Sequence, residues 1–284
     1  EVLCAADLNT ELATRFTQAE GIALAPSFEA VLADPRIEGV VLCTPHSLHT
    51  EQIVAAAQAG KHVFCEKPLT LTRADALRAV AAVNQHGRVL AVGHERRFEA
   101  PIQRAMAMIH SGELGKPLQM EANFSQDKFL GMDPNNWRLS AAEAPAGPMT
   151  ATGIHLLDLS MGVFGEAETV FASVKQLGSH LVNGDTLAIL ATYKGGGHAL
   201  ISAILATPFV GRFAVYCSQG WVEVRDNSHP EASTGWVLTS CLRGQEPRTE
   251  VFEAHPAVLA NLEAFADAAF GLSLIHISEP TRRS

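Results

Sequence analysis

Short apolar segments alternate with stretches of helical periodicity in the first third of the chain. The apolar segments occupy residues 2–6, 39–43, 62–66 and 89–93. Strands that are apolar on both faces belong in a parallel sheet that is covered by helices. The alternation therefore predicts a doubly wound α/β domain over residues 1–97.

Capping residues predict where the intervening helices begin and end. Asn9 or Thr10 is expected to begin a helix that ends at Gly21. The apolar residues expected to face the core from this helix are Leu12, Phe16 and Ala19. Thr72 and Asp75 form a capping-box pattern at the start of a later helix.

The periodicity changes near residue 98, where a second domain is expected to begin. A helix over about residues 102–112 is followed by segments in which apolar and polar residues alternate: 118–124, 170–174, 186–193, 198–205, 212–217, 221–224 and 236–241. Three consecutive glycines, residues 195–197, predict a hairpin-type turn between two of these segments. This pattern predicts an α+β domain of antiparallel strands over residues 98–271.

Composition and charge exclude several classes of protein. Hydrophobic residues make up 47% of the chain and charged residues 18%, as in soluble globular proteins. The net charge of −9 argues against a nucleic-acid partner, which needs a basic surface. No apolar run is long enough to span a membrane. The 5 cysteines are scattered without a C-x-x-C pair, which favours a reducing compartment and a cytoplasmic protein.

Asp7 stands at the end of the first predicted strand, just before a helix cap. In a doubly wound sheet, an acid at the end of the second strand hydrogen-bonds the adenosine ribose, about 20 residues after a glycine-rich phosphate loop. In this interpretation the loop would lie upstream of residue 1, and the carboxylate would favour NAD over NADP. Arg15 leaves NADP open. The alternative is that Asp7 is an ordinary turn residue.

Neither end of the printed chain resembles a native terminus. The chain starts without Met, directly in a predicted strand, so any targeting signal would lie upstream. Residues 272–284 resemble the translation of a transposase sequencing adapter, and we exclude them from the fold. We therefore expect a fragment that lacks the first strand of its nucleotide-binding domain and is inactive by itself.

The segment 44–49 follows a predicted strand at the carboxyl end of the sheet, where open α/β folds bind ligands. Thr44 offers a hydroxyl and backbone groups, and Pro45 stiffens the loop. His46 and His49 are close in sequence, but no third ligand follows at helical spacing, so a metal site is not expected. His49 is instead expected to begin a helix and to face the cofactor.

Glu66-Lys67-Pro68 places an amine directly after the third apolar segment. A residue before proline is held in an extended conformation, and the bond between them can be cis. The lysine is therefore directed rather than free to move. The alternative for an isolated Lys-Pro pair is a solvated lysine in a loop.

Four motifs in this order resemble the Gfo/Idh/MocA oxidoreductase family over nearly all of residues 1–271. They are Thr44-Pro45 with His49, residues 59–63 (AGKHV), Glu66-Lys67-Pro68 and residues 93–98 (GHERRF). The resemblance implies a Rossmann domain that binds NAD or NADP and a C-terminal α+β domain with a large, mostly antiparallel sheet. It also implies a sugar, polyol or related small molecule as substrate, and a homodimer or homotetramer that pairs through that sheet.

The resemblance implies roles for individual residues. Lys67 and His155 would be catalytic, with His155 in the segment 153–158 (GIHLLD). The complete set of residues expected to contact the cofactor is Asp7, Thr44, Pro45, His49, Glu66 and Lys67. The residues expected to contact substrate are Arg96, Trp137, Arg138, His155 and Asp158.

One position departs from the family pattern. Many members carry an aspartate four residues before the catalytic histidine, and this chain has Ala151 there. Asp158 shares a helical face with His155 and is one candidate to orient its ring. The other interpretation of Asp158 is a buried partner of a backbone donor.

Together these features predict an NAD(P)-dependent dehydrogenase or reductase that acts on CH–OH groups. A neutral imidazole at His155 would take the hydroxyl proton, and Lys67 would stabilise the developing alkoxide. Two alternatives stay open. One is a reductase of the same fold that acts on a non-sugar such as a dihydrodiol or an imine. The other is a non-catalytic nucleotide-binding regulator, which Ala151 favours.

Overall fold

The computed structural model describes residues 1–271, and these form two compact units. The first comprises Glu1–Gly93 together with residues 262–271, and the second comprises His94–Asn261. The adapter-like segment, residues 272–284, lies outside the described residues. The chain therefore returns to the first unit near its end, whereas the sequence pattern assigned all of residues 98–271 to the second domain.

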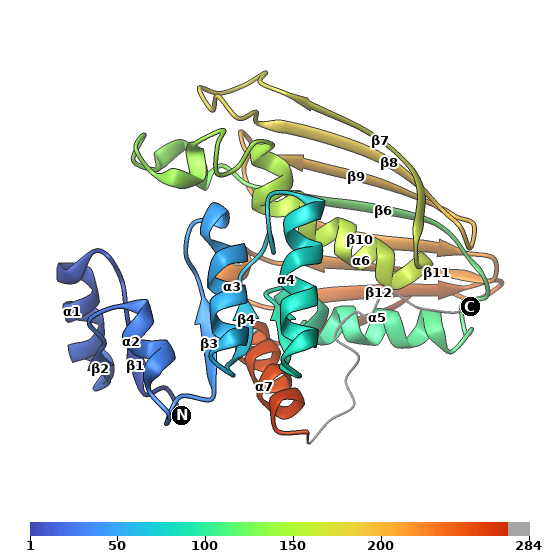
Figure 1. Cartoon of the computed structure of the whole chain (residues 1–284). Helices are drawn as coiled ribbons and strands as arrows, with labels where there is room; N and C mark the ends of the chain where they lie inside the picture. The colour runs from blue at the N-terminus through green and yellow to red at the C-terminus, as the bar shows by residue number, and fades with distance from the viewer. Residues whose placement is uncertain (272–284) are drawn as a thin grey trace. The chain divides into compact units, whose positions relative to one another are not determined.

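The first unit is an α/β domain with parallel strands (Figure 1). One sheet has the order β3-β4-β5, with strands β3 (Gly39–Leu42), β4 (His62–Cys65) and β5 (Leu90–Val92). A second parallel pair consists of β1 (Cys4–Ala5) and β2 (Ala23–Leu24). The helices between the strands are α1 (Thr10–Glu20), α2 (Phe28–Ala33), α3 (His49–Gln58) and α4 (Arg73–Gln85). The predicted alternation of parallel strands and helices is confirmed.

Helix α1 has the predicted ends but not the predicted inward face. It begins after the Asn9 cap and ends at Gly21, which is in the left-handed conformation (φ 68°). The residues expected to face the core are all exposed: Leu12, Phe16 and Ala19. The buried positions are Ala13 and Thr17. Strands β1 and β2 have only 2 residues each, so they cover a narrow strip of the helix.

The second unit is built on an eight-stranded sheet of order β13-β12-β11-β10-β6-β9-β8-β7. Its strands are β6 (Pro117–Ser125), β7 (Ala167–Lys175), β8 (Thr186–Tyr193), β9 (His198–Ile204), β10 (Val210–Cys217), β11 (Gly220–Asp226), β12 (Trp236–Leu242) and β13 (Arg248–Phe252). Neighbouring strands are antiparallel except β6 and β9, which are parallel. The large, mostly antiparallel sheet is thus confirmed.

Two helices of the second unit, α5 (Ala100–His110) and α6 (Ile154–Phe164), lie on the same face of this sheet (Figure 1). Their apolar residues join the inward residues of the sheet in one buried cluster that includes Ile102, Leu156, Leu159, Ile189 and Phe213. The opposite face of the sheet carries polar residues and several exposed apolar ones. The sheet and these two helices therefore form the rigid frame that positions the residues of this unit.

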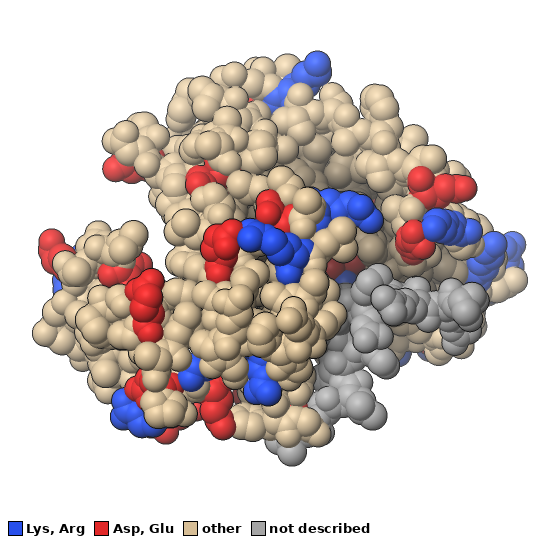
Figure 2. All heavy atoms as spheres, in the orientation of Figure 1, with Lys and Arg blue, Asp and Glu red and all other residues tan. Residues whose placement is uncertain are grey.

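Some elements are absent from the sequence prediction: β2, β13 and α7 (Ala257–Ala269). The remaining short helices are His46–Leu48, Glu95–Phe98, Lys128–Gly131, Trp137–Leu139 and Pro230–Ala232, with a π-helical turn at Met149–Gly153. Of the helices within residues 1–271, none is both long and apolar enough to cross a membrane. On the face drawn in Figure 2, acidic and basic side chains are interspersed over a mostly uncharged surface.

Candidate active site

Lys67 follows β4 at the carboxyl edge of the parallel sheet in the first unit. Its backbone N–H donates to Glu66 Oε2 at 3.2 Å, and its bond to Pro68 is cis. The Glu66 carboxylate lies against Gly93, where an added Cβ would stand 2.8 Å from Oε1. A glycine after β5 therefore leaves the space that this carboxylate occupies beside the predicted catalytic lysine.

His49 is completely buried at the start of α3 (0% exposed). Its Nε2 lies 3.0 Å from the carbonyl oxygen of Thr44, and its Nδ1 lies 3.0 Å from that of Pro68 and 3.3 Å from that of Leu69. The ring thus links the loop after β3 to the loop after β4. These contacts hold the two loops together, and the predicted position of His49 beside the cofactor stays a prediction.

The other predicted cofactor residues also lie at strand ends. Thr44 Oγ1 donates to Gln52 Oε1 at 2.5 Å, and Pro45 directly precedes the short helix His46–Leu48. Asp7 follows β1 and is exposed, and its Oδ1 accepts a hydrogen bond from the backbone N–H of Asn9 at 2.7 Å. That bond is typical of a turn residue, and the predicted contact of Asp7 with a ribose stays a prediction.

The two neighbouring histidines, His46 and His49, have their ring centroids 5.8 Å apart in an edge-on arrangement. Within residues 1–271, no group of three or more His, Cys, Asp or Glu residues is arranged to hold a metal ion. The buried ring of His49 already lies against three carbonyl oxygens. His49 therefore holds the two loops together, and the His46 ring packs edge-on against it.

His155 lies in the first turn of α6, and its side chain is 3% exposed. Its ring centroid is 6.2 Å from that of Phe124 on β6 and 5.9 Å from that of His94, whose ring is perpendicular to it. Its Nδ1 lies 3.7 Å from Glu95 Oε2. A buried imidazole with a carboxylate at one nitrogen is an arrangement suited to general acid–base chemistry.

Asp158 pairs with Arg97 rather than with His155. The guanidinium donates from Nε and Nη2 to the two carboxylate oxygens at 2.5 and 2.6 Å, a bidentate pair. Asp158 Oδ1 also lies 3.9 Å from Nε2 of His94. Neither interpretation of Asp158 from the sequence describes this arrangement, because its partner comes from a different element of the chain.

The sequence analysis did not select His94, Glu95 or Arg97 as site residues. All three belong to the segment 93–98, which served there only as a family motif. Their position was a usable signal, because they directly follow the apolar segment that becomes β5, at the edge of the sheet where open α/β folds bind ligands. This position in the sequence did not predict which of the three residues would lie against His155.

Arg96, which was predicted to contact substrate, is buried in an ion cluster. It is 2% exposed, its Nη2 lies 2.9 Å from both oxygens of Asp226 and 3.2 Å from Glu99 Oε2, and its guanidinium lies 4.9 Å from the ring centroid of Phe124. Burial, opposed in part by Arg96, raises the pKa of Glu99 to about 8. Arg96 therefore packs behind Phe124, on which His155 also packs.

Trp137 and Arg138 lie in the short helix Trp137–Leu139 of the second unit. The Arg138 guanidinium lies over the indole ring of Trp137 at 4.2 Å, a cation–π contact. The side chain of Asn183 donates to the carbonyl oxygen of Arg138 at 3.3 Å and so fixes this turn. The exposed guanidinium keeps its predicted role as a substrate contact open to test.

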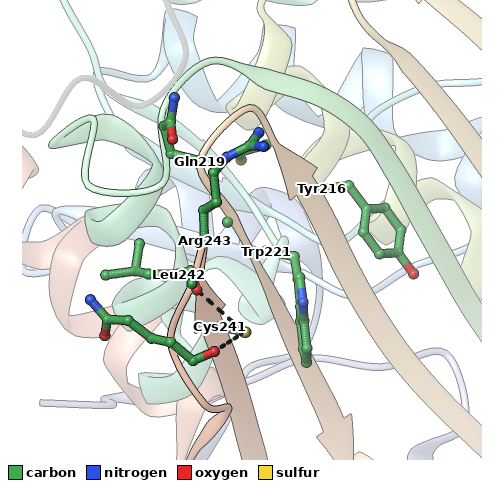
Figure 3. Close-up of a pocket in the computed structure, with 10 residues that line it drawn as sticks. Tyr216, Gln219, Trp221, Cys241, Leu242 and Arg243 are labelled. Atoms are coloured by element: carbon green, nitrogen blue, oxygen red, sulfur yellow. Dashed lines mark hydrogen bonds between the residues drawn. The ribbon is translucent and has the colours of Figure 1, made fainter.

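A separate hollow of about 290 Å³ lies in the second unit at the ends of β10, β11 and β12. Figure 3 shows Tyr216, Trp221 and Arg243 around it. Cys241 Sγ lies 3.5 Å from the carbonyl oxygen of Leu242, the last residue of β12. None of the predicted site residues described above lines this hollow.

Two family models match the chain. The one described as "Oxidoreductase family, NAD-binding Rossmann fold" matches residues 1–94. The one described as "GFO/IDH/MocA C-terminal domain" matches residues 102–223. Together the two matches cover most of both compact units.

Individual proteins and structures agree with these matches. The chain is 30% identical to "Uncharacterized oxidoreductase YrbE" of Bacillus subtilis over 220 residues, which are 72% of this chain and 59% of that protein. It is 29% identical to myo-inositol 2-dehydrogenase of Thermotoga maritima over 180 residues, 60% of this chain and 51% of that enzyme. The chain thus spans little more than half the length of these relatives.

A solved structure of levoglucosan dehydrogenase, in complex with NADH and levoglucosan, superposes with a TM-score of 0.81. The alignment covers 95% of this chain and 81% of that chain at 22% sequence identity. At this identity the likeness shows a shared fold.

Proposed function

We propose, because the chain belongs to the Gfo/Idh/MocA oxidoreductase family, that the protein transfers a hydride between NAD(P) and a secondary alcohol or ketone of a sugar, polyol or related small molecule. The observation that carries this proposal is the buried imidazole of His155 with a carboxylate at its Nδ1. The relative that acts on myo-inositol supports the substrate class. Lys67 at the carboxyl end of β4 supports the same reaction.

The first unit offers suitable groups for the dinucleotide at the ends of its parallel strands. Asp7 after β1 would accept from the hydroxyls of the adenosine ribose, a role that favours NAD because the carboxylate would repel the 2′-phosphate of NADP. Thr44 after β3 and Glu66 after β4 would contact the rest of the cofactor. NAD(P), when bound, accepts or supplies the hydride.

The residues of this chain supply the proton chemistry. In the direction of alcohol oxidation, His155 takes the hydroxyl proton as a general base. The Lys67 ammonium donates a hydrogen bond to the oxygen on which negative charge develops. In the direction of ketone reduction, the same imidazole returns the proton as a general acid. Trp137 and Arg138 are proposed to contact the substrate.

The proposal is tested on the protein expressed from its complete reading frame, with a panel of sugars and polyols and with NAD⁺ and NADP⁺ supplied separately. Cofactor reduction with at least one member of the panel is expected, as is a preference for NAD⁺. Lys67→Ala should lower turnover by about 10²-fold or more, because it removes a donor to the developing oxyanion. The matched control is Lys175→Ala at the exposed end of β7, which should leave turnover unchanged.

Tight nucleotide binding without turnover on any substrate would instead support a non-catalytic regulator. Turnover on an imine or dihydrodiol alone would keep the reaction type and replace the substrate class. Wild-type turnover in Lys67→Ala would remove the lysine from the mechanism.

We also propose that the protein forms a homodimer, or a homotetramer built from such dimers, through the open face of the large sheet. Three exposed apolar residues stand in register across β7, β8 and β9: Phe171, Leu190 and Leu200. They are 71%, 42% and 42% exposed. An apolar row of this kind on a flat sheet is suited to pairing with a second copy.

A further inference from the structure

Glu95 is the first residue of the short helix Glu95–Phe98, and His155 is the second residue of α6. The two residues are far apart in sequence, but Glu95 Oε2 lies 3.7 Å from His155 Nδ1. The carboxylate side chain is 22% exposed and the imidazole is 3% exposed. The contact is therefore largely shielded from solvent, which strengthens the attraction between a carboxylate and an imidazolium.

The helix that carries His155 offers no carboxylate for this position. Ala151 lies in the π-helical turn before α6 and packs against the apolar cluster of Phe129, Leu139, Leu181 and Leu205. An alanine side chain has no acceptor atom that could orient the ring of His155.

The carboxylate on the same helix is committed to another partner. Asp158 receives two hydrogen bonds from the Arg97 guanidinium, one on each oxygen. This bidentate pair turns both oxygens of Asp158 toward Arg97. Glu95, in contrast, has a carboxylate oxygen 3.7 Å from a ring nitrogen of His155.

We propose that Glu95 is a positioning residue of His155, which orients its ring through the charge of the carboxylate; this rests on the proposed function. At 3.7 Å, longer than a hydrogen bond, the Glu95 carboxylate acts through its charge, which favours the neutral tautomer that carries the proton on Nδ1. The lone pair then resides on Nε2. Nε2 is thereby assigned as the atom that takes the proton of the substrate hydroxyl.

The other groups packed around His155 are consistent with this role. His94 meets the ring edge-on, and its own Nε2 faces the Asp158 carboxylate at 3.9 Å. Phe124 contacts both the His155 ring, with centroids 6.2 Å apart, and the Arg96 guanidinium at 4.9 Å. Glu95 thus presents a formal negative charge to the imidazole, while Asp158 is paired with the Arg97 guanidinium.

The decisive experiment is an NMR titration of the His155 imidazole in the chain as printed, which needs no substrate and no cofactor. Glu95→Gln keeps the length of the side chain and an acceptor oxygen but removes the charge, and it should lower the measured pKa of His155 by about one unit. Glu95→Met keeps only the shape, and it should also shift the neutral ring away from the Nδ1–H tautomer, as read from the ring ¹⁵N shifts. Glu113→Gln, a charge removal at an exposed turn of the same unit, is the control and should change neither.

Kinetics on the complete protein separates this proposal from the proposed function. With turnover established, Glu95→Met should lower kcat on the order of 10²-fold with little change in KM. Glu95→Gln should lower kcat by a smaller factor. If the pKa and the tautomer of His155 are the same in the wild type, Glu95→Gln and Glu95→Met, the role of Glu95 is overturned, whatever the activity. Shifted titration in a protein without turnover would support the Glu95–His155 relation and overturn the proposed function.

Discussion

Asp226 at the end of β11 accepts from Nη2 of Arg96 with both of its oxygens at 2.9 Å, although the two residues are 130 positions apart. The Arg96 and Asp226 side chains are 3% and 1% exposed. The indole N–H of Trp236 also donates to Asp226 Oδ1 at 3.0 Å. A second carboxylate, Glu99, completes this buried cluster. Two acids therefore share the Arg96 guanidinium, and Asp226 lies closer to it than Glu99 does.

Removing Asp226 should be costly. Asp226→Asn leaves the Arg96 cation buried without its closest counter-ion, and we expect a loss of about 3 kcal/mol in the free energy of unfolding. Glu99→Gln should cost about 1 kcal/mol or less, because Glu99 is already held toward its neutral form. Urea unfolding of the two variants measures the contrast. Equal losses would contradict the unequal sharing of Arg96.

The same cluster predicts a dependence of stability on pH. Burial raises the pKa of Glu99 to about 8 in the folded state, against 4.5 for an unperturbed carboxyl group. The folded state therefore binds the extra proton between these values, so the contribution of Glu99 is fully present below about 4.5 and is lost as the pH rises toward about 8. Glu99→Gln should lack this part of the pH dependence. If the free energy of unfolding of the wild type instead rose with pH over this interval, relative to that of Glu99→Gln, this prediction would be wrong.

Asp185 should stabilise the loop before β8 through its ionised form. Burial alone would raise its pKa, but hydrogen bonds from Leu177 N, Ser179 Oγ, Gly178 N and Thr186 Oγ1 lower the pKa to about 2. The stabilisation is present above the unperturbed value of 3.8 and is lost as the pH falls toward about 2. Asp185→Asn should cost about 2 kcal/mol at neutral pH and much less near pH 2. Denaturation at both pH values decides this, since a loss that is independent of pH would indicate a packing defect instead.

Gly93 should be needed for the cofactor side of the first unit. In Gly93→Ala the new Cβ would stand 2.8 to 2.9 Å from the carboxylate atoms of Glu66, so the carboxylate must move. We expect the Kd for NAD(P) to rise about fivefold in the complete protein, the equivalent of one hydrogen bond. Gly131→Ala is the control, because nothing lies within 4 Å of its added Cβ. Calorimetric titration of both variants with NAD(P) measures this Kd. An unchanged Kd in Gly93→Ala would remove Glu66 from the cofactor site.

Leu190 stands in the centre of the apolar row on the open sheet face, between Phe171 and Leu200. Leu190→Glu should shift the protein toward the monomer, because a charge in an apolar interface must be desolvated on pairing. Light scattering coupled to size-exclusion chromatography measures the mass. Leu77→Glu, on an exposed face of α4, introduces the same charge outside the sheet and should leave the mass unchanged. An unaltered mass in Leu190→Glu would place the interface elsewhere.

Local sequence signals predicted most elements of both units. Thr72 and Asp75 were predicted to cap a helix, and Thr72 Oγ1 does accept from the Asp75 N–H at 3.1 Å. The strand predicted at residues 186–193 is β8 (Thr186–Tyr193). These signals work because caps and strand periodicity depend on neighbours only a few positions apart. Strand β13, with little alternation in its burial pattern, escaped the same analysis.

Predictions about partners were less successful because a partner depends on packing. Helical spacing placed Asp158 on the face of His155, but Arg97, which is 61 positions away from Asp158, holds it instead. In the same way, Leu12 and Phe16 form an apolar face of α1, yet the elements available to cover that helix bury Ala13 and Thr17. For α1 the sequence identified the wrong inward face, and for Asp158 it could not identify the partner, because both depend on which elements pack together.

The sequence by itself determined the order of elements, the change from parallel to mostly antiparallel sheet, and the presence of an amine at Lys67 and an imidazole at His155. Each of these follows from local patterning or from a short motif. Only the tertiary structure decided that Glu95 lies against His155 and that Arg96 is buried with Asp226. The reason is physical: the partner of a buried charge is set by which strands and helices pack together, and those contacts join residues that no local pattern connects.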